Sequence, residues 1–137
     1  MHRPAYHGIL RNDMELSEQA LDHFGEILIK RVRAEAILDW TKILDGRMKG
    51  VRAERLRPEL SGLDPGQMAL IQRLLPQVVD TVLHHLLWTL EQEESIDVAV
   101  RTAEGLVPSL REVSDGLAGE LYGWIPRFGE ADDHTEH

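Results

Sequence analysis

The chain contains no cysteine among its 137 residues. Disulfide bridges, thiolate nucleophiles, and zinc or iron–sulfur sites with thiolate ligands are therefore excluded by composition. Aromatic residues are scarce, at 5% of the chain. No apolar run approaches the roughly 20 residues that span a bilayer, and residues 1–16 contain no apolar core of secretory length. We expect a soluble, cytoplasmic protein with no membrane partner.

Sequence motifs of common enzyme classes are also absent. There is no glycine-rich phosphate loop and no G-x-S-x-G nucleophile elbow, and the carboxylates follow no demanding spacing. We therefore predict no catalytic residue and no cofactor.

The composition is that of a folded domain. Hydrophobic residues make up 42% of the chain and charged residues 28%, which are ordinary globular values. A length of 137 residues suits one domain that buries a core without metal or disulfide support. We predict a single helical domain over residues 1–130 and a disordered acidic tail over residues 131–137.

The net charge of -9 is unevenly distributed. Residues 1–58 carry eleven Lys/Arg and nine Asp/Glu, a net of +2, whereas residues 59–137 carry four and fifteen, a net of -11. A negative chain disfavours nucleic acid and anionic membranes as partners. The acidic C-terminal half suits a basic partner, or it is a solvated surface that favours solubility.

Apolar residues at helical spacing predict a first long helix from Ser17 to Leu44. Ser17 is a suitable N-cap, and Gly46 and Gly50 can adopt the left-handed conformations that end helices. The predicted apolar positions are Leu21, Phe24, Leu28, Val32, Leu38 and Leu44.

A second long helix is predicted to begin at Asp64–Pro65 and to end near Glu93. Asp64 is the expected N-cap, and Pro65 stands at the first helical position, where its missing amide has no cost. Because Pro76 lies inside this helix, we expect a kink or a break near Leu75.

The segment Ser95–Leu110 allows two interpretations. Ile96, Val98 and Val100 alternate as in a short strand, but the segment also fits a helix that ends at Gly105. We expect a small β-hairpin, with the helix as the alternative.

Two shorter segments complete the predicted fold. Residues 51–60, interrupted by Pro58, form a connector or a brief helix, and residues 115–124 form a final helix before Pro126. The fold class is mainly α: a compact bundle of three to four helices with two long antiparallel helices, and a small β-hairpin near residues 95–110.

A mostly polar face of the second long helix carries Asp80, His84, Trp88 and Glu91. A large aromatic side chain among polar groups is typical of interface hot spots, so these four are candidate partner-binding residues. The alternative is that the helix is central and packs on both sides. A metal site is not predicted. Two histidines on one helix can bind the same metal ion when they stand four residues apart on one face, but His84 and His85 are adjacent and point about 100° apart.

The C-terminal segment adds two aromatic candidates for partner binding, Tyr122 and Trp124. Each can either close the core or meet a partner. Gly116, Gly119 and Gly123 fall near one helix face, which suggests close docking against a neighbouring helix.

A basic cluster forms a candidate anion-binding site for a phosphate or an acidic surface. No interleaved aromatic residue or nucleic-acid motif accompanies it, and a solvated connector is the alternative. Its members are Arg47, Lys49, Arg52, Arg55 and Arg57.

Two stretches of the chain carry a resemblance to a known family. They are Leu63-Asp64-Pro65-Gly66-Gln67, which opens the helix that reaches His84-His85, and Glu120-Leu121-Tyr122-Gly123-Trp124-Ile125. They resemble small bacterial proteins of an uncharacterised helical family, in which an L-x-P-x-Q helix start is followed by a short hairpin and an E-L-Y-x-W-like closing helix. The resemblance covers about half of the chain. It implies the hairpin but no activity or site.

These features favour a non-catalytic protein-binding module, such as an immunity protein that neutralises a toxin or a related accessory factor. A protein partner or a homodimer is expected. One alternative is a helical-bundle enzyme or a small-ligand or metal-binding protein, with a pocket between the long helices near His84 and His85. A second alternative is a regulatory nucleic-acid-binding module that uses the basic cluster.

Overall fold

The computed structural model of the chain describes residues 6–129, with side chains from residue 13 onward. Its elements are α1 (Tyr6–Ile27), the π-helical segment η1 (Leu28–Arg33), α2 (Ala34–Leu44), α3 (Val51–Leu60), α4 (Pro65–Gln92), β1 (Val100–Thr102), β2 (Gly105–Val107), the 3-10 turn η2 (Leu110–Val113) and α5 (Leu117–Phe128). The mainly α fold class is confirmed. The predicted tail, residues 131–137, lies outside the described residues.

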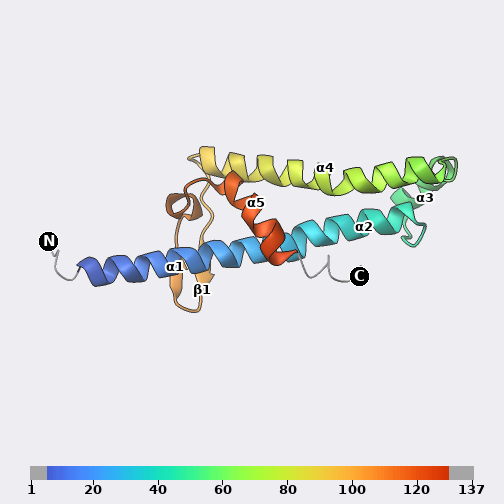
Figure 1. Cartoon of the computed structure of the whole chain (residues 1–137). Coiled ribbons are helices and arrows are strands. Elements are labelled where there is room, and N and C mark those ends of the chain that lie inside the picture. Colours follow the sequence, from blue (N-terminus) through green and yellow to red (C-terminus); the bar gives the residue numbers. More distant parts are fainter. Residues whose placement is uncertain (1–5, 130–137) are drawn as a thin grey trace.

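Two long helical elements form the frame of the molecule (Figure 1). α1, η1 and α2 follow one another as a continuous rod, and α4 lies antiparallel to it. α3 connects the two at one end. α5 descends from the C-terminal half of α4 to the middle of the rod, and the β-hairpin lies against α1 at the opposite end from α3.

Local sequence marks the start of α4 and the end of the rod, but Ser17, the predicted N-cap of the first long helix, lies inside α1. At the start of α4, the Asp64 side chain accepts a hydrogen bond from the Gln67 amide at 2.8 Å, and the Gln67 side chain accepts one from the Asp64 amide at 2.9 Å. This reciprocal cap confirms the predicted start. After α2, Gly46 and Gly50 have φ of 81° and 122°, the positive values expected where the rod ends.

Three prolines, Pro58, Pro76 and Pro126, lie inside helices, and none of them ends its helix. A kink or a break was predicted near Leu75. α4 is continuous through Pro76 and gently curved, so the break does not occur (Figure 1). Val79, one turn later, packs against the hydrophobic core. α5 likewise continues through Pro126, past its predicted end at residue 124, because Ile125 and Phe128 also pack against the core.

The rod changes its helical phase at η1. The Ala34 amide donates to the carbonyl of Ile29, five residues earlier, so this turn contains one extra residue. The residues that follow are rotated relative to a uniform α-helix. Val32, inside η1, and Leu38, after it, are exposed, so the prediction that they are apolar core positions is wrong.

The segment between residues 95 and 110 is a hairpin, as expected, and not a helix. Val100 pairs with Val107, and Thr102 pairs with Gly105 across the turn. Val100 and Val107 are both buried against α1 and the rest of the core.

The hydrophobic core lies where α5 bridges α1 and α4. Its most buried large side chains are Ile29, Leu87, Leu110, Leu117, Leu121 and Trp124. The end of the molecule near α3 is thinner, with Ile43, Leu44 and Ala53 as its buried apolar residues. None of the helices between residues 6 and 129 is both long and apolar enough to cross a membrane.

Candidate functional site

Four of the six predicted partner-binding residues meet where α4 packs against α5. Here the surface contains a hollow of about 570 Å³. Its lining residues are His84, Trp88, Glu91, Asp115, Gly116, Ala118, Gly119 and Glu120. Tyr122 on α5 joins the group because its hydroxyl lies 3.0 Å from Nδ1 of His84. We call this region the α4/α5 hollow.

The hollow is bordered by aromatic side chains that remain accessible to solvent. Trp88 is 48% exposed and Tyr122 is 57% exposed. Trp88 follows His84 by one helical turn, and the His84 and Tyr122 rings are 5.9 Å apart between centroids. The alternative in which α4 packs on both sides and buries Trp88 is therefore wrong.

Two glycines of the C-terminal segment form part of the lining of the hollow. Gly116 and Gly119 lie in the lining, and a Cβ atom added at Gly119 would meet no atom within 4 Å. The same is true of Gly123. The prediction that these glycines allow a helix to dock closely is thus wrong for Gly119 and Gly123, which face open space.

The charged residues in the lining are all acidic. Glu91 accepts a hydrogen bond from the Ala118 amide at 3.3 Å and so caps the N-terminus of α5 from across the helix interface. Glu120 accepts one from the Ser114 hydroxyl at 2.9 Å. Asp115 is exposed beside them. No Lys or Arg is among the eight lining residues, so the hollow suits a cationic group.

No family model, curated protein or solved structure matches this chain. The resemblance to small bacterial helical proteins therefore stays a prediction.

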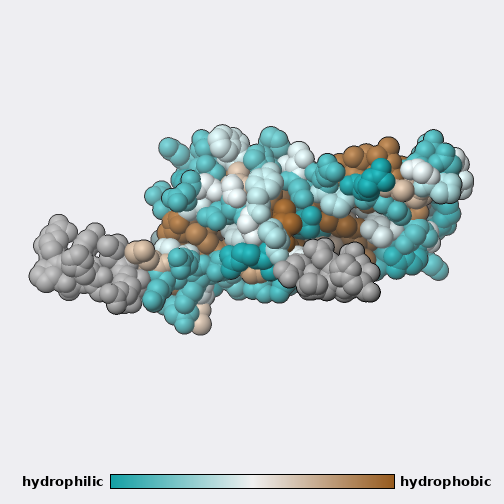
Figure 2. Space-filling view, viewed as in Figure 1, coloured by the Kyte–Doolittle hydropathy of each residue, from teal (hydrophilic) through white to brown (hydrophobic). Residues whose placement is uncertain are grey.

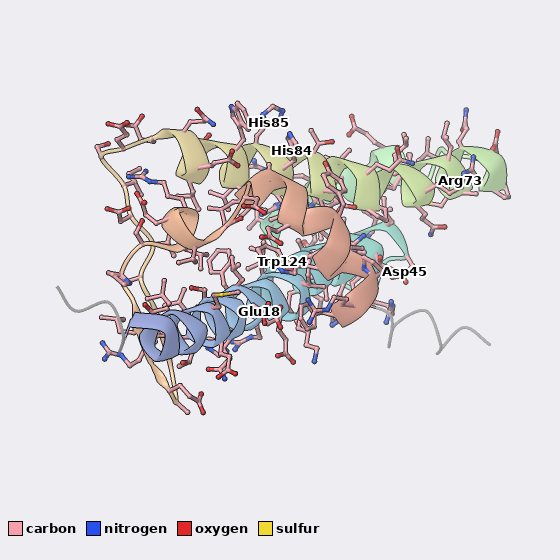
Figure 3. All side chains as sticks on the ribbon, turned by 60° about the vertical axis from the view of Figure 1, so that its left-hand side comes forward. Glu18, Asp45, Arg73, His84, His85 and Trp124 are labelled. Carbon is pink, nitrogen blue, oxygen red and sulfur yellow. The ribbon has the colours of Figure 1, made fainter. Side chains whose placement is uncertain are left out.

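The other two predicted partner-binding residues lie outside the hollow. Trp124 is 2% exposed and lies between α5 and α1, so it closes the core and cannot meet a partner (Figure 3). Asp80 is bound by Arg33 of η1, whose Nε and Nη2 lie 2.6 and 3.2 Å from its two carboxylate oxygens.

The two adjacent histidines lie in different surroundings. His85 is exposed and lies outside the lining of the hollow, and the two rings are perpendicular, with an angle of 87° between their planes. Figure 3 shows both rings projecting from α4. Within the described part of the chain, no group of three or more His, Asp or Glu side chains is placed to hold a metal ion.

The predicted basic cluster is divided among local contacts. Arg47 forms an ion pair with Asp45 at 2.8 Å, and the guanidinium of Arg52 lies 5.5 Å from the ring centre of Trp40. Arg57 donates to the carbonyl of Met48 at 3.4 Å. Lys49 and Arg55 are exposed. A shared anion site in this cluster stays a prediction.

A second hollow lies on α2, where Phe128 of α5 approaches it, and has a volume of about 540 Å³. Its lining combines apolar residues, including Ile29, Ile37 and Leu38, with Lys30, Glu35 and Thr41. None of the predicted partner-binding residues lies in it, whereas four of the six meet at the α4/α5 hollow. We therefore place the candidate site at the α4/α5 hollow.

Proposed function

We propose that this chain is a non-catalytic protein-binding module that recognises its partner through the α4/α5 hollow. The single observation that carries the proposal is the exposure of Trp88 at the edge of an acid-lined depression. Burying an aromatic ring of this size at an interface is a common source of binding free energy.

The chemistry of the lining defines the complementary surface. The three carboxylates favour a Lys or Arg side chain, and the faces of Trp88 and Tyr122 favour the same cations through their π-systems. A basic segment with an apolar residue beside it would match both features. An accessory or immunity protein that covers a basic surface of its partner would act in this way.

The Trp88→Ala variant tests the proposal. Because the side chain is half exposed, its loss should change thermal stability little. Partner affinity should fall by about 2 kcal/mol or more, roughly 30-fold, as expected for a hot spot. The partner is first captured from the cells that make the protein and is then titrated by calorimetry.

Leu106→Ala is the matched control for this experiment. Leu106 lies on the hairpin, away from the hollow, and is 47% exposed, nearly the same as Trp88. It should leave affinity unchanged. Equal affinities for the two variants would contradict the proposal, and so would a large loss of folding stability in Trp88→Ala.

Asp115→Asn tests the electrostatic part. Removing one exposed carboxylate should slow association and weaken the salt dependence of binding, with a smaller effect on dissociation, because charges at the edge of an interface mainly steer the encounter. Stopped-flow association at several salt concentrations measures this. An unchanged salt dependence would show that the acidic lining does not face the partner.

The two alternative functions have less geometric support. The hollow that contains His84 lies between α4 and α5 and does not include His85, so it differs from the pocket predicted between the two long helices. The basic cluster is divided among local partners. A metal or metabolite retained by the purified protein would favour the first alternative, and salt-sensitive nucleic-acid binding lost on charge reversal at Arg52 and Arg55 would favour the second.

A further inference from the structure

A row of large apolar side chains on α4 is only partly covered by the described chain. The row follows every fourth residue, and each member is between 44 and 63% exposed. Its members are Leu70, Leu74, Val78, Val82 and Leu86. We call it the α4 ridge. Figure 2 shows apolar surface over the half of α4 that lies near α3, where the ridge begins.

The ridge stands on the least charged long element of the molecule. Between residues 65 and 90, the only charged residues are Arg73 and Asp80, and Asp80 is bound by Arg33. These two charges cancel, so the net charge of -9 belongs to the rest of the chain. Two copies of an acidic chain repel each other through most surfaces. The α4 ridge is a surface where two copies can meet without bringing carboxylates together.

The spacing of the ridge also suits a copy of itself. Rows of residues four apart form ridges on a helix, and when such ridges of two helices interdigitate, the helices cross at about -50°. In two copies of this chain, both helices carry the same ridge. Each ridge can therefore pack against the other in a contact with two-fold symmetry. We infer that the α4 ridge is the contact surface of a homodimer in which the two α4 helices cross near Val78.

The small size of the ridge limits the expected affinity of this dimer. Monomers rarely expose contiguous apolar patches beyond a few hundred Å², so an apolar ridge that runs over more than four turns is unusual for a surface that stays in water. A standard interface removes about 800 Å² from each partner, and one pair of crossing helices covers less than that. Dimerisation should therefore depend on concentration in the micromolar range.

Sedimentation equilibrium of the full chain tests the inference. At about 100 μM the apparent molecular mass of the protein should be twice the chain mass of 15.6 kDa. The Val78→Glu variant should have the apparent mass of the monomer. Gln77→Glu is the control, because it adds the same charge at an exposed neighbour that points about 100° away. It should remain dimeric. Circular dichroism checks that both variants keep their helical content.

A mixing experiment identifies the occupant as a second copy. If the helices cross near Val78, Val78→Glu and Val78→Lys should each be monomeric alone, and an equimolar mixture should recover the dimer mass. A wild-type chain that is monomeric at about 100 μM would overturn the inference and leave the ridge to a different protein. A Val78→Glu variant as dimeric as Gln77→Glu, or a mixture that stays monomeric, would also overturn it. Partner binding through Trp88 is measured separately. The absence of partner binding would therefore not change the mass measured in any of these sedimentation experiments.

Discussion

Trp124→Ala should lower the free energy of unfolding by about 3–5 kcal/mol, the range for removing a buried aromatic ring. Trp124 is one of the most buried large side chains. Its ring meets Phe24 of α1 edge to face, with the centroids 5.9 Å apart. The side chain therefore joins α5 to the rod, and its loss leaves a cavity between them. Urea unfolding followed by circular dichroism measures the change.

Tyr122→Ala provides the matched control on the same helix. Tyr122 precedes Trp124 by two residues, but it points outward and is exposed. Its removal should cost less than about 1 kcal/mol, as is usual for surface positions. Similar losses for the two variants would mean that α5 does not pack against α1 through Trp124.

Gly25→Ala should destabilise the fold by about 2 kcal/mol or more, although alanine is the better helix former by about 0.5–1 kcal/mol. A Cβ atom at Gly25 would lie 2.5 Å from Cδ2 of the Trp124 ring, far inside contact distance. The buried ring cannot move without disturbing the packing of α5. The substitution should therefore lower the melting temperature.

Gly123→Ala is the control for this second prediction. It also replaces a helical glycine, but the new Cβ would meet nothing within 4 Å. Stability should rise by about 0.4–1 kcal/mol, because alanine loses less backbone entropy on folding. If both alanine variants raise the melting temperature, the close approach of Trp124 to α1 is wrong. In the double variant Gly25→Ala/Trp124→Ala, the cost of the alanine at Gly25 should largely disappear, since the ring that it meets is gone.

The parts of the fold that could be predicted from sequence depend on neighbouring residues. Asp64, Pro65 and Gln67 form their cap within four positions, so the start of α4 could be located without knowing the tertiary structure. The alternation of Val98 and Val100 indicated the hairpin in the same way. The π-turn at η1 could not be found, because the hydrogen bond from Ala34 to Ile29 has no local sequence signal.

The candidate site could be predicted in part for the same reason. Helical periodicity placed His84, Trp88 and Glu91 on one side of α4, and the structure brings them to one hollow. The contribution of Asp115 and Glu120 could not be foreseen, since it depends on where α5 crosses α4. The one sequence feature that indicates an open surface beside these two carboxylates is the set of glycines near the start of α5. Glycines at this spacing are equally typical of a close helix–helix contact.

The choice between Tyr122 and Trp124 shows what tertiary packing decides. Two residues apart on a helix, their side chains point about 200° apart, so only one can enter the core. Sequence does not distinguish them. The absence of a side chain at Gly25 makes room for the larger ring and leaves Tyr122 outside, beside His84.

Site-specific photo-crosslinking tests the protein-binding function most directly. A photoreactive benzoyl-phenylalanine replaces Tyr122 at the edge of the α4/α5 hollow, and in a parallel strain it replaces Leu106 on the hairpin. After irradiation of living cells, mass spectrometry should identify one protein joined at position 122, absent at position 106, and lost when Trp88→Ala is added. The same products at both positions, or none at position 122, would contradict the account.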